Sequence, residues 1–129
     1  MSSKISIVCV SGTRERLQMA AMVASVASAT GDQVTVFFSM NALRYFVRGN
    51  AQDAPAEDEF GTLLEQDGVP SFRQLFRQAA ELGDAALLPC SMAVDLLKLR
   101  KEELDPAFGP PTGLTRFLSD AAGGQVYTF

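Results

Sequence analysis

Strand-like apolar runs alternate with helical segments along this chain, and that alternation restricts the possible folds more than any single motif does. The first run, KISIVCVS (4–11), is almost continuously apolar and rich in β-branched residues, as strands covered on both faces are. Further runs are QVTVFFS (33–39), DAALLPC (84–90) and QVYTF (125–129). Helical patterns fall at 14–30, at about 40–48, between Ser71 and Gly83, at about 91–98 and around 114–121. This order predicts right-handed crossovers and a parallel sheet with helices on both faces.

The length and composition are those of one globular domain. The 129 residues suffice for a single core, and 47% of them are hydrophobic while 20% are charged. We therefore expect one domain spanning 1–129. Residues 50–68 interrupt the alternation with the acidic, Pro-containing stretch NAQDAPAEDEF. We interpret them as an exposed excursion, with one helical turn in TLLEQ.

The charge balance and the apolar pattern exclude several classes of partner. The formal net charge is −4 and the pI about 4.7, which argues against nucleic acid binding because phosphate recognition needs clustered Lys and Arg. No apolar stretch reaches the ~20 residues of a membrane span. The first residues, MSSKISIVCV, lack the features of a signal peptide. We therefore expect a cytoplasmic protein.

The chain has two cysteines and no histidine. The absence of His removes Ser-His and Cys-His catalysis and any His-ligated metal. Cys9 and Cys90 form neither a CxxC pair nor a zinc pattern, so we expect free thiols, no metal and no organic cofactor.

In open parallel sheets, sites lie beyond the carboxyl ends of the strands. The predicted ends here are Ser11-Gly12-Thr13, Ser39-Met40 and Pro89-Cys90-Ser91. Cys90 therefore lies where such folds keep their chemistry, directly before a predicted helix.

Position alone leaves two interpretations of Cys90. A free cysteine commonly packs as a small, buried apolar side chain. Alternatively, Cys90 is a reactive thiol, because the unpaired N–H groups and the dipole at a helix start favour the thiolate. Cys9 lies in the middle of a strand covered on both faces, which predicts an inert core thiol.

The segment SGTRER (11–16) offers a second kind of site. Arg14 and Arg16 can hold an anion at a helix N-terminus, although a solvent-exposed pair of arginines is the alternative. One glycine without GxGxxG or GK[ST] does not indicate a dinucleotide site or a P-loop. The candidate substrate- or anion-binding residues are Gly12, Thr13 and Arg14, with Ser91 and Met92 after the third strand.

Three blocks of the sequence carry a family resemblance. They are KISIVCVSGTRERLQMAAMVASVASATGDQVTVFFSMNALRYF, then GVPSFRQLFRQAAELGDAALLPCSMAVDLLKLRKEEL, and last the Gly-rich turn, amphipathic helix and final strand. Together they cover nearly the whole chain. They resemble the DsrE/DsrF-like family and, within it, the DsrE-like or peroxiredoxin-like branch. The motif CSMAVD after GVPSF…AAELG is the most specific part of the match.

The resemblance implies a fold, an assembly and a role. The fold is a three-layer α/β/α domain with a mostly parallel sheet of four or five strands, assembled into trimers or hexamers. The role is sulfur relay, in which a cysteine takes up sulfur as a persulfide and passes it on, and this maps onto Cys90 as the catalytic residue. We therefore expect a sulfurtransferase-like persulfide carrier that exchanges sulfur with donor and acceptor proteins.

Two other functions stay open at this stage. The first is a non-catalytic, oligomeric binding or assembly module of the same fold, in line with the absence of His and of a second nearby Cys. The second is a nucleotide or anion binder that uses Thr13, Arg14 and Arg16.

Overall fold

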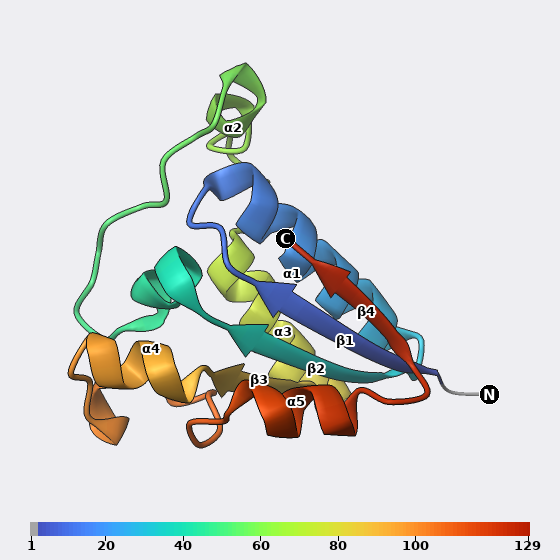
Figure 1. Ribbon diagram of the computed structural model, residues 1–129. Coiled ribbons are helices and arrows are strands. Elements are labelled where there is room, and N and C mark those ends of the chain that lie inside the picture. Colours follow the sequence, from blue (N-terminus) through green and yellow to red (C-terminus); the bar gives the residue numbers. More distant parts are fainter. Residues whose placement is uncertain (1–2) are drawn as a thin grey trace.

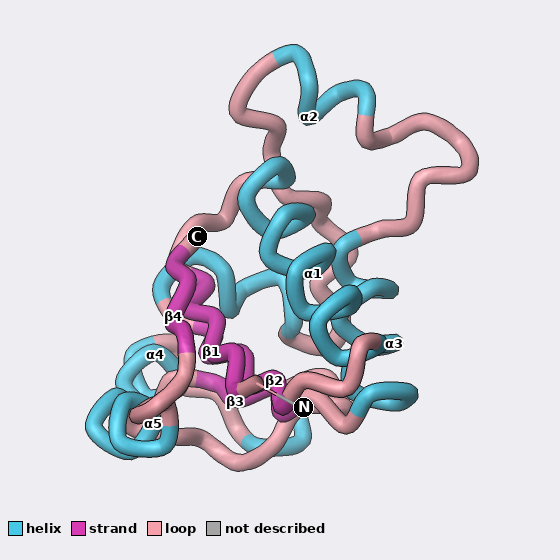
Figure 2. The backbone as a smooth tube through the Cα atoms, turned by 90° about the vertical axis from the view of Figure 1, so that its right-hand side faces the viewer, coloured by secondary structure: helices cyan, strands magenta, loops and turns pink. Residues whose placement is uncertain are grey.

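The computed structural model describes residues 3–129 and shows a parallel β-sheet between two layers of helices (Figures 1 and 2). The strands are β1 (Lys4–Cys9), β2 (Gln33–Phe38), β3 (Ala86–Pro89) and β4 (Gln125–Thr128). The α-helices are α1 (Arg14–Ala29), α2 (Glu59–Leu63), α3 (Phe72–Gly83), α4 (Ser91–Leu96) and α5 (Leu114–Asp120), and the 3-10 helices are η1 (Met40–Phe46) and η2 (Lys101–Glu103). Within residues 3–129, no helix has the length and apolar character needed to cross a membrane.

The sheet contains four strands in the order β3-β2-β1-β4, and each neighbouring pair is parallel. This confirms the predicted three-layer α/β/α class with a mostly parallel sheet. The registers Cys9↔Phe38 and Phe38↔Pro89 bring the carboxyl ends of β1, β2 and β3 level at one edge. The strand β4 is the edge strand opposite β3, and all four of its residues are exposed.

Two adjacent phenylalanines of β2 join the sheet to both helical layers. Because successive strand residues point to opposite faces, Phe38 packs against Phe76 of α3 while Phe37 packs against Phe117 of α5. The ring centroids lie 5.0 and 4.9 Å apart, respectively. Phe37 and Phe38 are almost completely buried. Burial of each such side chain contributes about 1.5–3 kcal/mol, so this strand holds both layers in place.

The helices α1 and α3 pack closely on one face of the sheet (Figure 2). Gly83 lies at their contact, where a Cβ would be 2.4 Å from the Cβ of Ser28. The helix α3 ends at Gly83, as predicted, and the left-handed residue that follows it is Asp84, with φ 57. The glycine is therefore required by helix packing, and the turn is made by the next residue.

The helix α4 ends in a Schellman motif whose left-handed residue is Lys98. The Lys98 N–H donates to the Asp95 carbonyl at 3.1 Å, and the Leu99 N–H donates to the Val94 carbonyl at 3.0 Å. Lys98 has φ 53, a conformation that costs residues with a Cβ about 1–2 kcal/mol. The helix consequently ends at Leu96 and not at 98, where the sequence predicted its end.

Residues 50–68, which we call the strap, cross the N-terminal end of α1 (Figure 1). Most strap side chains are exposed, but Ala54 is fully buried and α2 forms within the segment. The predicted helical turn in TLLEQ is found slightly earlier, at Glu59–Leu63.

We expect the change Lys98→Gly to raise the free energy of unfolding by about 0.5–1 kcal/mol, because glycine adopts the left-handed conformation without a Cβ penalty. Urea denaturation measures the difference. The matched control is Lys101→Gly, the same change at a residue that is not left-handed, and it should lower the free energy by a similar amount. Equal losses in both variants would contradict the strain at Lys98.

Candidate functional site

Cys90 lies at the carboxyl edge of the sheet, between β3 and α4. Its N–H donates to the Phe38 carbonyl at 2.8 Å, and its carbonyl accepts the Val94 N–H at 2.9 Å. These two bonds tie its backbone to the neighbouring strand and to the helix. The side chain is 6% exposed, so the thiol lies just beneath the surface. The predicted location at a strand end is found, while its reactivity stays a prediction.

The segment 108–113 closes the outer side of the sheet beside Cys90. It pairs with the β3 region through the parallel bridges Leu87↔Phe108 and Cys90↔Thr112. The Thr112 N–H donates to the Pro89 carbonyl, and the Thr112 carbonyl accepts the Ser91 N–H, both at 2.9 Å. The backbone N–H of Ser91 is thus already hydrogen-bonded to Thr112. Only the Ser91 hydroxyl remains for binding a ligand.

Two methionines give this edge an exposed apolar rim. Met40 is 55% exposed and Met92 is 48% exposed. The register Phe38↔Pro89 continues to Ser39 beside Cys90, and Met40 follows directly. Met40 has φ 53, so a non-glycine residue is held in the left-handed region here. Met40 was not among the candidate residues, although its place directly after β2 is the signal that marks it.

Gly12, Thr13 and Arg14 lie at the end of β1, and β2 separates them from Cys90. Strands in a sheet are about 4.8 Å apart, so β1 and β3 are separated by about 10 Å. The Gly12 backbone approaches η1 closely, since a Cβ there would lie 2.9 Å from the Cβ of Asn41. The candidate residues therefore form two groups along one edge of the sheet.

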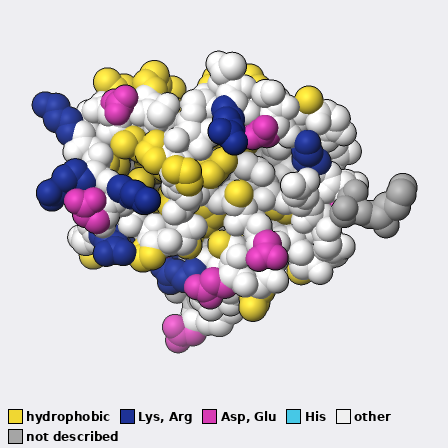
Figure 3. Space-filling model, turned by 90° about the horizontal axis from the view of Figure 1, so that it is seen from below, with side chains coloured by type: hydrophobic (Ala, Val, Ile, Leu, Met, Phe, Trp, Pro, Cys, Tyr) yellow, Lys and Arg dark blue, Asp and Glu magenta, His cyan; other side chains and the backbone are white. Residues whose placement is uncertain are grey.

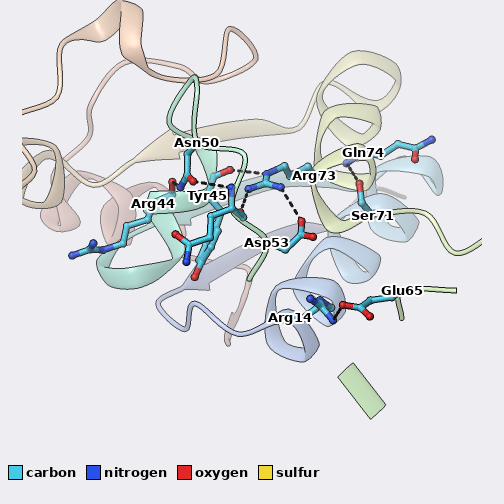
Figure 4. A network of polar contacts seen from close by, with 10 residues as sticks. Arg14, Arg44, Tyr45, Asn50, Asp53, Glu65, Ser71, Arg73 and Gln74 are labelled. Carbon is cyan, nitrogen blue, oxygen red and sulfur yellow. Dashed lines mark hydrogen bonds and ion pairs between the residues drawn. The ribbon is translucent and has the colours of Figure 1, made fainter. Parts of the chain in front are cut away.

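The strap covers the second of these groups. The Thr13 hydroxyl donates to Glu57 at 2.6 Å, and the Glu57 and Asp58 N–H groups donate to the Glu15 carboxylate at 2.8 and 2.9 Å. Arg14 pairs with Glu65 at 2.8 Å (Figure 4). Thr13 and Arg14, which were predicted to bind an external anion, thus bind carboxylates of the same chain.

A second arginine holds the strap from the other side. Arg73 of α3 donates to the carbonyls of Tyr45 and Gln52 at 2.8 and 2.9 Å, and it lies 3.7 Å from Asp53 (Figure 4). The guanidinium also stacks on the Phe72 ring, 5.3 Å from the centroid. Together with Arg14, this residue attaches the strap to both α1 and α3.

The carboxylates in these contacts are stabilised in their charged form. The Glu57 N–H holds the pKa of Glu15 below its usual range, and the Thr13 hydroxyl, followed by Arg16, does the same for the pKa of Glu57. In the described part of the chain, no three His, Cys, Asp or Glu side chains converge as metal ligands would. The contacts that the strap carboxylates do make are ion pairs and hydrogen bonds within the chain.

Cys9 lies in the core and forms no disulfide with Cys90. It is 1% exposed, and burial raises the pKa of its thiol from 9.0 to about 12. The thiol is therefore neutral throughout the physiological range, as predicted for a core thiol. Its predicted place in the middle of the strand is wrong, because Cys9 is the last residue of β1.

Comparisons with known proteins identify a matching sequence family and solved structures with a similar fold. The model of the DsrE/DsrF/DrsH-like family matches residues 56–129, which include Cys90. The YchN protein from Escherichia coli superposes with a TM-score of 0.69 at 13% identity, over 100% of both chains. MTH1491 from Methanobacterium thermoautotrophicum, a protein of unknown function, superposes with a TM-score of 0.68 at 8% identity, over 99% of this chain and 100% of its own. No curated protein sequence matches the chain.

We expect the change Cys9→Ala to flatten the loss of stability at alkaline pH. Between about pH 9 and 12 the unfolded thiol is deprotonated while the folded thiol keeps its proton, so the stability present below pH 9 declines as the pH rises. This one group contributes up to about 1.4 kcal/mol per pH unit. Urea unfolding of both proteins between pH 8 and about pH 10.5 measures the slope, and parallel slopes would contradict the buried thiol.

Proposed function

The chain belongs to the DsrE/DsrF/DrsH-like family, and we propose on that basis that it is a sulfurtransferase-like persulfide carrier whose sulfur-binding residue is Cys90. The observation that carries this proposal is the position of Cys90, at the carboxyl end of β3 and inside the part of the chain that the family model matches. The proposed cycle requires neither a metal nor an organic cofactor.

The proposed cycle consists of two thiol exchange steps. The Cys90 thiolate attacks the outer sulfur of a donor persulfide, the donor S–S bond breaks, and the donor leaves as a thiolate with the electron pair. Cys90 then carries the sulfur as a persulfide. An acceptor thiolate attacks that outer sulfur and regenerates the Cys90 thiolate. Sulfur moves without net oxidation, because each S–S bond that breaks is replaced by another.

Three features around Cys90 bear on the proposed role: the start of α4, the burial of the residue, and two exposed methionines nearby. The Ser91 N–H is taken by Thr112, but the next N–H groups of α4, those of Met92 and Ala93, lack intrahelical acceptors and favour negative charge at that end of the helix. The residue is 6% exposed and packs against the hydrophobic core, a position that a small buried side chain also takes. The exposed Met40 and Met92 provide an apolar rim against which a donor or acceptor protein can seat.

We also propose that the chain forms a homo-oligomer, a trimer or hexamer, as the family resemblance implies. The support is an exposed apolar surface at the β4 side of the sheet. A groove of about 550 Å³ runs between α1 and β4 and is lined in part by Met22, Val26 and Tyr127, which are 45%, 64% and 41% exposed. Open strand edges and apolar surfaces of this kind are usually covered by a partner.

The test of persulfide carrying is mass spectrometry after incubation with a small persulfide donor. We expect Cys90 to gain one sulfur atom, the Cys9→Ala variant to gain the same, and the Cys90→Ser variant to gain none, because burial raises the pKa of the Cys9 thiol to about 12 and keeps that thiol protonated. Release of the added sulfur by a low-molecular-weight thiol should restore the original mass. An unmodified Cys90, with a family relative modified in parallel, would favour a non-catalytic binding or assembly module.

The test of assembly is light scattering coupled to gel filtration. We expect the double change Met22→Lys and Val26→Glu to yield monomers, because it places charges in the groove between α1 and β4. The control is Leu82→Glu, which adds a charge at an apolar residue that is 85% exposed outside that groove and should leave the assembly unchanged. A monomeric wild-type protein at micromolar concentration would overturn the proposed assembly.

A further inference from the structure

Four cationic side chains gather at one end of the molecule without partners. Six arginines in residues 3–129 form ion pairs, and Lys4 donates to backbone carbonyls. The side chains without an ion pair or hydrogen bond within that range are the exposed Arg44, Arg48, Lys98 and Lys101, which we call the basic patch. Every other cation of the described chain is already engaged.

Two segments distant in sequence build the basic patch. Val47, directly after η1, pairs with Leu104 in an antiparallel bridge, and the Arg48 N–H donates to the Glu103 carbonyl at 2.6 Å. The end of η1 is thereby joined to the segment that follows α4. Figure 3 shows Lys and Arg side chains gathered at its left, the side on which α4 ends in Figure 1. The two segments that carry the four cations are therefore joined, and Arg48 and Lys101 line one groove.

A groove with an apolar floor lies within this surface. It has a volume of about 290 Å³ and is lined by Arg48 and Lys101, with Leu104, Pro106 and Phe108 beneath them. The Phe108 ring is supported by Phe46, with centroids 5.2 Å apart. The groove therefore combines unpaired positive charge with room for a large apolar side chain.

The two carboxylates that line the groove are already engaged. Asp105 pairs with Arg77 at 3.1 Å and accepts the Ala107 N–H at 2.9 Å. Glu102 is 68% exposed and lies 3.8 Å from Arg100, which also binds Glu103 at 3.2 Å. Neither carboxylate of the groove contacts Arg48 or Lys101, so these two cations are free to pair with carboxylates of an approaching molecule.

We propose that the basic patch docks a short acidic segment of a partner protein, which inserts an aromatic or branched apolar side chain into the groove. Carboxylates of the segment would pair with Arg48 and Lys101, while the apolar side chain would cover Phe108. The patch contains neither Cys90 nor its neighbours, so this inference goes beyond sulfur transfer and does not depend on it.

The charge of the remaining molecule favours a short segment over an extended polyanion. The formal net charge of the chain is −4, and without the four cations of the patch the rest carries −8. A nucleic acid or an anionic bilayer would extend over that negative surface and be repelled, whereas a segment confined to the patch would not. Binding through exposed ion pairs should be fast, weak and sensitive to salt.

The experiment is fluorescence anisotropy with a labelled glutamate peptide that carries two central phenylalanines. We expect the full chain to bind it at low salt and the variant Arg48→Glu/Lys101→Glu to bind at least about tenfold more weakly. An all-glutamate peptide should also bind more weakly, because the groove stays empty. The control Arg116→Glu makes the same kind of charge change on α5, where the side chain is 80% exposed, and should bind as the wild type does.

The same variants distinguish peptide docking from binding of a nucleic acid or a bilayer, and from sulfur transfer at Cys90. Cys90→Ser should bind the peptide unchanged, and Arg48→Glu/Lys101→Glu should still take up sulfur from a small donor. Equal binding by the wild type and the double variant would overturn the inference. Patch-dependent binding of a labelled oligothymidylate or of phosphatidylserine vesicles, with no binding of the peptide, would also overturn it.

Discussion

The structure depends on the packing of β2 between the two helical layers. In β2, Phe37 faces α5 and Phe38 faces α3, so one strand anchors both sides of the sheet. Its register with β1 and β3 also aligns the carboxyl ends of three strands. The two groups of candidate residues at this edge, one with Cys90 and one with Gly12, are therefore positioned by the same hydrophobic contacts that stabilise the fold. A cavity in this strand would disturb the core and the candidate site together.

The fold was predictable because its signals are local. Apolar runs with β-branched residues, the alanines of α1 and the cap at Ser71 each act within a few residues. Their alternation predicts a parallel sheet with helices on both faces, while the strand order was not predicted. The position of Cys90 at a strand end followed from the same reasoning. Its side-chain exposure did not, because the bridge between Cys90 and Thr112 joins residues 22 positions apart in a way that no local pattern marks.

Two features that sequence reasoning did not anticipate depend on long-range contacts. The small size of Gly83 serves the contact with Ser28, while Asp84 makes the turn after the helix. Arg14 suggested an anion site, but Glu65 of the strap already meets its guanidinium. At both positions the residue type indicates what kind of contact is possible. Tertiary packing determines which residue makes that contact.

The left-handed turn at Lys98 places two demands in competition at one position. Glycine would relax the backbone there, but it would also remove a cation from the basic patch. The same side chain thus carries a backbone cost of about 1–2 kcal/mol and one of the four charges of the proposed docking surface. At the end of this six-residue helix, a substitution that relaxes the backbone would also weaken the charge of that surface.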